Sequence, residues 1–444
     1  MTGTFVHSFE IDYDKCCGSM ACLRTCPTEA LRVRDGKVRH YPEMCVDCGG
    51  CIAICPSGAF KVTTDSLSDL DNYQYKVAIP SVTLYGQFGL DVSVDEVNNG
   101  LLSLGFDEVY DDRIEVELVT RAISEYIHNH EGPFPLISTL CPVVVRLIQV
   151  SYPYLVDQII PMDVPREIAA REIKKKYSVE LGIPADRIAA VYLSPCPGKV
   201  TSVHHPAQGG ESEIDFAIGI SDIYNDLQYA INKNKQQSGN GHESKLTFNL
   251  TTINWALSGG QSKYLTDINT LSVIRLENVI HMLEELSMGK IGDIQFLEAF
   301  ACAGGCVGGP LTVQNIYMAR SKLRRLSAEW PLHDPEIAYE VSDRYNMPDY
   351  LLKNQLEPRP IKEQKMTMAQ RITRMKQAET IRNTLPGIDC AVCGSPTCEV
   401  FAHDVVDGEA GIDECFLLSD DIVNKLRKIY RTDNMPPGWI EREP

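Results

Sequence analysis

Two cysteines, Cys302 and Cys306, are separated by three residues within a segment (296–310) that is otherwise rich in glycine and apolar residues. Thiolates at this spacing, beside glycines that let the backbone approach closely, suit an iron–sulfur cluster. Half of a zinc site or a reactive dithiol would use the same spacing, so the pair by itself leaves three kinds of chemistry open. The apolar run 294–301 predicts a buried strand, which would place both cysteines at the end of a strand.

The number of cysteines indicates metal binding. The chain has 16 cysteines in 444 residues: eight before residue 56, four between residues 141 and 306, and four between residues 390 and 415. We find no signal-peptide pattern and no apolar run of membrane-spanning length, so we expect a cytoplasmic protein without membrane insertion. In that compartment, many cysteines favour metal sites over disulfides. Four cysteines per cluster would use all of them in about four [4Fe–4S] clusters.

The charge pattern narrows the range of partners. The net charge is −18, and lysine and arginine do not gather in a cluster typical of nucleic-acid binding. We therefore expect no nucleic-acid partner. An acidic surface would suit the basic docking face of a redox partner. The length predicts two or three domains.

The N-terminal region contains a repeated cysteine motif. Its second half is a complete C-x2-C-x2-C-x3-C-P run, with Cys45, Cys48, Cys51 and Cys55. Its first half has Cys16, Cys22 and Cys26 in the corresponding places. Ser19 stands where the second cysteine of that half belongs, and Cys17 is additional. This region resembles a bacterial-type two-cluster ferredoxin, and we assign residues 1–75 to such a domain.

The ferredoxin resemblance implies two sets of ligands, because the fourth cysteine of each run crosses to the other cluster. One cluster would be held by Cys26, Cys45, Cys48 and Cys51. The other would be held by Cys16, Cys22 and Cys55. The fourth ligand of that second cluster stays open between Cys17, the alkoxide of Ser19 and a three-iron cluster that needs none. The total of sixteen cysteines favours Cys17.

Between residues 76 and 350, short apolar segments alternate with longer helical patterns. This alternation predicts an α/β domain with a largely parallel sheet. The strands expected here are 76–81, 108–110, 135–139 and 188–193, and a helix is expected through 121–130. Ligands of such sheets gather beyond the carboxyl ends of the strands. Cys141, Cys196 and the pair Cys302/Cys306 each follow an expected strand, so all four could meet at one edge of the sheet.

Three motifs of this region resemble, in order and spacing, the signature motifs of the catalytic domain of [FeFe]-hydrogenases: Leu140-Cys-Pro, the Ser-Pro-Cys-Pro-Gly-Lys of 194–199, and the Ala-Cys-Ala-Gly-Gly-Cys-Val-Gly-Gly of 301–309. The resemblance implies that Cys141, Cys196, Cys302 and Cys306 hold a [4Fe–4S] cluster. It further implies that Cys306 bridges to a two-iron unit carrying CO, cyanide and an azadithiolate. Lys199 would bind a cyanide ligand of that unit, and Pro80 and Ser81 would lie against it. Without the resemblance, Lys199 is a surface lysine and Pro80-Ser81 an ordinary turn.

The departures from this family all affect proton transfer or the surroundings of the two-iron unit. Leu140 stands where active members have a relay cysteine. The positions of the relay carboxylates fall near Val119 and Ala122, and that of the relay serine falls on Ile160. Two methionines of the family are replaced by Ser194 and Phe300. Proton transfer needs titratable groups within hydrogen-bond reach, so the usual route is absent and we expect slow turnover.

The C-terminal region contains the last four cysteines. The pattern of 363–385 predicts an amphipathic helix in a connecting segment (351–386). The spacing of Cys390, Cys393, Cys398 and Cys415 resembles the small [4Fe–4S] domain of electron-transport and corrinoid iron–sulfur proteins, expected here at 387–420. A zinc site would use the same four thiolates. A tail (421–444) with a short basic helix (422–431) would follow.

The three regions together resemble sensory-type [FeFe]-hydrogenases. The favoured hypothesis is an oxidoreductase that binds the six-iron H-cluster, has an impaired proton relay and exchanges electrons with H2 slowly. Its partner would be a ferredoxin, an NADH-linked subunit, or a sensor kinase or phosphatase. The alternative is an electron-transfer subunit with [4Fe–4S] clusters alone and no H2 chemistry. Lys199, Pro80 and Ser81 favour the first hypothesis, and the lost relay residues favour the second.

Overall fold

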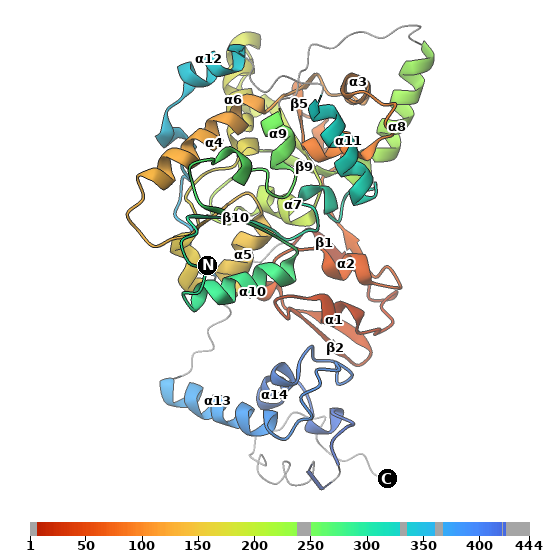
Figure 1. Cartoon of the computed structure of the whole chain (residues 1–444). Helices are drawn as coiled ribbons and strands as arrows, with labels where there is room; N and C mark the ends of the chain where they lie inside the picture. Colours follow the sequence, from red (N-terminus) through yellow and green to blue (C-terminus); the bar gives the residue numbers. More distant parts are fainter. Residues whose placement is uncertain (1–6, 238–249, 329–334, 360–366, 420, 423–444) are drawn as a thin grey trace.

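A computed structural model describes residues 7–237, 250–328, 335–359, 367–419 and 421–422 (Figure 1). A central α/β domain contains most of the chain. The N-terminal domain, red in Figure 1, lies between this central domain and the C-terminal region, which is blue. The basic helix expected at 422–431 falls almost entirely outside the described residues.

The N-terminal domain consists of two similar halves. Each half has one short helix that follows its first cysteines, α1 (Ala21–Thr25) or α2 (Gly50–Ile54). Two antiparallel strand pairs complete the domain: β1 (Phe9–Ile11) with β4 (Phe60–Val62), and β2 (Leu31–Arg34) with β3 (Lys37–His40). The internal repeat of the cysteine motif is therefore also a repeat of structure.

The first central sheet is parallel throughout, and its order is β6 (Glu108–Val109), β5 (Tyr75–Pro80), β8 (Ile188–Ser194), β9 (Phe216–Gly219). Side chains of β5 alternate between two faces, as the period of a strand requires. Ala78 faces a core made with α3 (Val94–Ser103), α8 (Ile220–Gln237), α9 (Leu250–Trp255) and α11 (Ile316–Ala328). Val77 and Ile79 face a core made with α6 (Pro165–Leu181) and α7 (Pro197–His204).

A second parallel sheet has the order β10 (Thr270–Ile274), β11 (Phe296–Phe300), β7 (Leu136–Ile137). One of its cores contains α5 (Pro142–Ser151) and α10 (Leu276–Ser287), and another contains α4 (Arg113–His128). The single sheet expected from the sequence is thus two sheets. Local patterns identify parallel strands, but which strands pair depends on contacts between distant segments.

Two helices differ from their predicted form. The helix expected through 121–130 begins earlier, as α4 at Arg113. The predicted connecting helix is α13 (Met368–Arg382), which buries Ala378 and Ile381 against α14 (Cys398–Val406) and therefore belongs to the packed C-terminal domain. Residues 363–366 of the expected range are not described.

The remaining helix is α12 (Pro335–Arg344), which contacts α4. None of the helices in the described ranges has the length and apolar character needed to cross a bilayer.

A buried ion-pair cluster fixes the C-terminal domain to β2. The guanidinium groups of Arg32 and Arg34 both donate to Oδ2 of Asp404 at 2.7 Å, and all three side chains are at most 7% exposed. Arg34 also donates to the hydroxyl of Ser395. The amide of Val33 donates a hydrogen bond to the carbonyl oxygen of Gly394 at 2.8 Å. Main-chain and side-chain bonds therefore hold the same contact between β2 and the C-terminal domain.

We predict that Asp404→Ala loosens this contact. Removing the shared carboxylate leaves two buried cations without a counterion, which costs roughly 3 kcal/mol or more. The amide of Val33 should then exchange with solvent deuterium about 100-fold faster. Arg39→Ala is the control. It removes the exposed ion pair of Arg39 with Asp35, and it should leave this rate unchanged. Equal protection of Val33 in Asp404→Ala and wild type would contradict the prediction.

Candidate metal centre

The four central cysteines follow the carboxyl ends of three parallel strands. Cys141 lies between β7 and α5, and Cys196 lies between β8 and α7. Cys302 follows β11, and Cys306 begins a short 3-10 helix. Because β8 belongs to one sheet and β7 and β11 to the other, the cysteines meet where the two sheets end together, and not at one edge of a single sheet.

The four thiols lie close enough to affect one another. The pKa of Cys302 is raised well above its usual value, first by burial and then by the charges of Cys196, Cys141 and Cys306. Burial likewise raises the pKa of Cys196 to about 12. Thiolates in such a group need bound metal to balance their charge. Four converging cysteines are the ligand set of a [4Fe–4S] cluster.

Glycine is required where the chain turns around these thiols. Gly305 has φ +94°, and a Cβ atom there would lie 2.6 Å from the carbonyl oxygen of Ala256. At Gly309 a Cβ atom would lie 2.2 Å from the carbonyl oxygen of Pro195. The close backbone approach expected from the sequence is therefore present.

A cavity adjoins Cys306. Its volume is about 60 Å³. On the same measure one water molecule needs roughly 10–15 Å³, so the cavity can hold a group larger than a single water. Of the residues predicted to surround a two-iron unit, Ser81, Leu140 and Lys199 line it, and Pro80 directly precedes Ser81 at the end of β5. The full lining is Ser81, Val82, Asp112, Val116, Leu140, Pro165, Arg166, Tyr192, Lys199, Thr252, Trp255, Ala256 and Cys306.

Hydrogen-bond donors face this cavity. Lys199 is 5% exposed, and its Nζ lies 3.4 Å from Sγ of Cys306 and 3.3 Å from the hydroxyl of Tyr192. Burial alone would lower the pKa of Lys199, but the charges of Cys306 and Tyr192 outweigh it and raise that pKa, so the ammonium stays charged. In the described part of the chain, Nε of Arg166 and Nε1 of Trp255 are buried without a hydrogen-bond partner. Lys199 is not a surface lysine, and the cavity suits an anionic ligand.

The other wall of the site is apolar. Five of the six positions that depart from the family pattern belong to one buried hydrophobic cluster, and Ser194 is the exception. The five are Val119, Ala122, Leu140, Ile160 and Phe300. Phe300 does not line the cavity and is 2% exposed within β11. Packed hydrocarbon thus occupies the positions where the usual proton route would run.

Several polar residues of the cavity, among them Arg166, Tyr192 and Asp112, were not predicted from the sequence. The carboxylate of Asp112 lines the cavity just before α4. The family pattern places relay acids near Val119 and Ala122, and not at the start of the helix. The acidic pair Asp111-Asp112 ahead of that helix was the available signal.

In the N-terminal domain the structure brings together the two sets of thiols that the ferredoxin resemblance implies. Burial is the largest cause of the raised pKa values of Cys45 and Cys51. The charges of Cys48 and Cys26 raise both pKa values further. Cys16 and Cys55 raise the pKa of Cys22, again after burial, to about 11. Cys17 and Ser19 are both exposed.

The N-terminal and central sites adjoin. Cys48 is among the groups that raise the pKa of Cys302. A Cβ atom at Gly49 would lie 2.7 Å from the ring of Pro310, so the ferredoxin loop packs directly on the third central motif. Asp47, in the same loop, is fully buried and pairs with Arg146 of α5 at 2.8 Å.

The four C-terminal cysteines also gather. Burial raises the pKa of Cys415, and Cys398 and Cys390 raise it further. Burial raises the pKa of Cys393 to about 11, with smaller effects of Cys415 and Cys390. Arg24, located in the N-terminal domain, donates to the carbonyl oxygen of Cys390 at 2.8 Å. This site therefore lies beside the ferredoxin domain.

Comparison with protein families gives each region a match. Residues 75–266 match the family described as iron only hydrogenase large subunit, C-terminal domain. Residues 8–56 match a 4Fe-4S dicluster domain, and residues 385–416 match an Fe-S cluster domain. The last match favours an iron–sulfur cluster over zinc at the C-terminal cysteines.

Individual relatives match only in part. The NADP-reducing hydrogenase subunit HndD of Solidesulfovibrio fructosivorans is 23% identical over 245 residues, which is 47% of this chain and 42% of that protein. Iron hydrogenase 1 of Clostridium pasteurianum is 25% identical over 265 residues, 50% of this chain and 46% of that protein. The chain thus spans less than half the length of both relatives. A solved structure of a variant of the [FeFe]-hydrogenase HydA1 from Chlamydomonas reinhardtii superposes with a TM-score of 0.49 at 16% identity, over 65% of this chain and 95% of that one.

We predict that Cys17 is the fourth ligand of the irregular N-terminal cluster. Cys17→Ala should convert that cluster to a three-iron form or empty it, with a loss of one to about four irons per protein. Electron paramagnetic resonance of the oxidised and reduced protein, with iron analysis, measures the change. Ser19→Ala is the matched control from the same exposed loop and should leave the spectrum unaltered. A loss in Ser19→Ala but not in Cys17→Ala would assign the serine, and no loss in either would indicate a three-iron cluster.

Proposed function

We propose, for this hydrogenase-like iron–sulfur electron-transfer protein, that the central site holds the six-iron cluster of [FeFe]-hydrogenases and exchanges electrons with H2 slowly. The observation that carries the proposal is the cavity beside Cys306, which Lys199 enters as a buried cation. An apolar core has no need of such a cation, and burying one is costly unless it meets a negative partner.

The residues of the site fit the six-iron cluster. Cys141, Cys196, Cys302 and Cys306 would ligate the [4Fe–4S] part, and Cys306 would also bridge to the two-iron part. Lys199, Arg166 and Trp255 offer N–H groups to anionic ligands such as cyanide. When bound, this group supplies the interconversion of H2 with protons and electrons. Ser81 and Leu140 would shape the cavity around it.

The other clusters would provide the path for electrons. Cys302 of the central site neighbours Cys48, and Cys51 neighbours Cys22 of the second ferredoxin site. Arg24 and Arg34 hold carbonyl groups of the C-terminal cysteine segment. We therefore infer a continuous series of sites from the cavity to the C-terminal domain, with a redox partner or a signalling partner as the destination of the electrons.

Slow turnover follows from the apolar cluster around Leu140. A proton cannot pass through packed hydrocarbon without titratable groups. A protein with slow turnover would be suited to H2 sensing. It could also act as a subunit of a redox complex in which another component limits the rate.

The same apolar cluster also favours a second candidate function. A protein that carries only [4Fe–4S] clusters has no need of a proton route, and loss of the relay positions costs it nothing. In that case the chain would be an electron-transfer subunit without H2 chemistry.

We predict carbonyl and cyanide infrared bands after maturation with a synthetic two-iron precursor, and we expect these bands to shift between argon and H2. The protein should contain about sixteen irons before maturation, four per cubane, and two more afterwards. Cys306→Ala is the control and should show no bands, because it lacks the bridging thiolate. About sixteen irons in the wild type with no bands after maturation would instead support the electron-transfer subunit.

A further inference from the structure

Asp112 brings a carboxylate to a cavity whose usual proton-transfer residues are missing. It lines the cavity together with Cys306, Lys199 and Leu140. It lies immediately before α4, but its side chain does not cap that helix. Aspartate at this position commonly accepts hydrogen bonds from the amides of the first helical turn. Asp112 makes no such capping bond and is one of the residues that line the cavity.

The charges around Asp112 favour exchange of a proton near neutral pH. Burial raises its pKa to about 8, the charges of Asp111 and Glu115 contribute, and Lys199 acts in the opposite direction. The other charged and titratable groups that face it are Arg113, which pairs with Asp111, Arg166 across the cavity, and Tyr85. An ordinary aspartate, with a pKa near 3.9, would stay ionised at neutral pH.

Polar groups continue from Asp112 toward the surface. Glu115 follows one helical turn later and is fully buried. It accepts hydrogen bonds from the hydroxyl of Tyr110 at 3.1 Å and from Arg344 at 3.0 Å. Arg344 also pairs with Glu172 and with Glu340, whose side chain is 49% exposed. The start of α4 thus lies between the cavity and an ionic cluster that reaches the surface.

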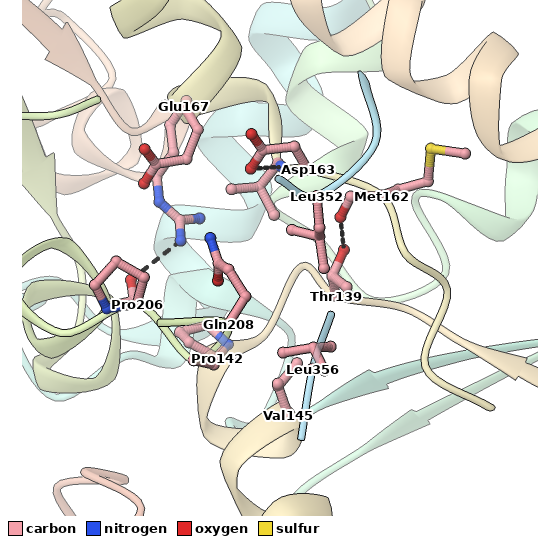
Figure 2. A pocket seen from close by; sticks show the side chains of 14 residues that line it. Thr139, Pro142, Val145, Met162, Asp163, Glu167, Pro206, Gln208, Leu352 and Leu356 are labelled. Atoms are coloured by element: carbon pink, nitrogen blue, oxygen red, sulfur yellow. Dashed lines mark hydrogen bonds between the residues drawn. The ribbon is translucent and has the colours of Figure 1, made fainter. Parts of the chain in front are cut away.

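A neighbouring pocket offers less suitable acids. Arg166 lines both this pocket and the cavity, and Figure 2 shows the carboxylates of Asp163 and Glu167 toward one end of the pocket, away from Val145 and Leu356. Glu167 accepts hydrogen bonds from the hydroxyl of Ser212 and from the amide of Glu213. Asp163 pairs with Arg171. Neither acid lines the cavity. Asp112 is the acid that does.

We propose that Asp112 is the proton-transfer residue of the central cavity, with Glu115 as the next acceptor toward the surface. This inference rests on the proposed function. Oxidation of one H2 yields two protons and two electrons. The electrons leave through the [4Fe–4S] clusters, and each proton converts the Asp112 carboxylate to the carboxylic acid, which passes it outward and becomes a carboxylate again. Proton reduction uses the same steps in reverse.

The first test needs no two-iron unit. In protein that holds only its [4Fe–4S] clusters, the infrared difference between wild type and Asp112→Asn should contain a carboxylic C=O band. That band should disappear as the pH rises through about 8. If the difference spectrum contains only carboxylate bands at neutral and lower pH, Asp112 does not hold a proton there and the proposal is overturned.

The second test uses the matured protein. Asp112→Asn should slow exchange of H2 with D2O about 100-fold, the size of effect expected when a proton-transfer group is removed. The carbonyl and cyanide bands should keep their intensity, and Asp112→Glu should recover most of the rate. Asp163→Asn is the matched control, because it removes a buried acid from the neighbouring pocket, and it should exchange at the wild-type rate.

The outcomes separate the two proposals. Wild-type protein without carbonyl and cyanide bands would refute the proposed function, and the role of Asp112 with it. Bands in the wild type together with full exchange in Asp112→Asn would refute the role of Asp112 alone. An equal loss in Asp163→Asn, or no recovery in Asp112→Glu, would show that the substitution acts through packing and would also overturn it.

Discussion

Burial raises the pKa of thiols such as Cys302 and Cys45, and iron must balance their charge if they are to act as ligands. Much of the chain serves to satisfy this condition. Strand ends from two sheets deliver the central thiols, and glycines such as Gly305 and Gly309 let the backbone pass close to them. Electron transfer adds a second condition, because neighbouring clusters must be held at a fixed separation. The packing of the ferredoxin loop on the third central motif suits this condition.

Helix α4 divides the central site chemically. Its middle contributes Val119 and Ala122 to the apolar cluster with Leu140, while Asp112 immediately precedes the helix and Glu115 lies in its first turn. Loss of a relay cysteine alone would leave acids stranded in hydrocarbon, which is costly. Replacement of all these positions by apolar residues avoids that cost and leaves Asp112, just before α4, among the residues that line the cavity.

The sequence predicts well what is local. Cysteine spacing, the strand before each central motif and the glycine-rich turns depend on neighbouring residues, and the structure places them as expected. The division into two sheets, the packing of α13 and the pairing of Arg32 with Asp404, 372 residues away, depend on distant contacts that no local pattern contains. Asp112 was not predicted for a related reason. The family pattern places acids further along this helix, and only the three-dimensional structure shows that the residue before the helix lines the cavity.

Electrons and protons place different demands on this chain. Electron transfer needs clusters held in place, and buried ion pairs such as Asp47–Arg146 and Arg34–Asp404 provide rigid contacts between the domains. Proton transfer needs a connected series of titratable groups, and it is this requirement that the apolar cluster around Leu140 compromises. In the proposed mechanism, the two pathways meet at the cavity beside Cys306. Substitutions on the proton side can therefore lower turnover while the electron path stays intact, which is the property a slow sensor or a regulated subunit requires.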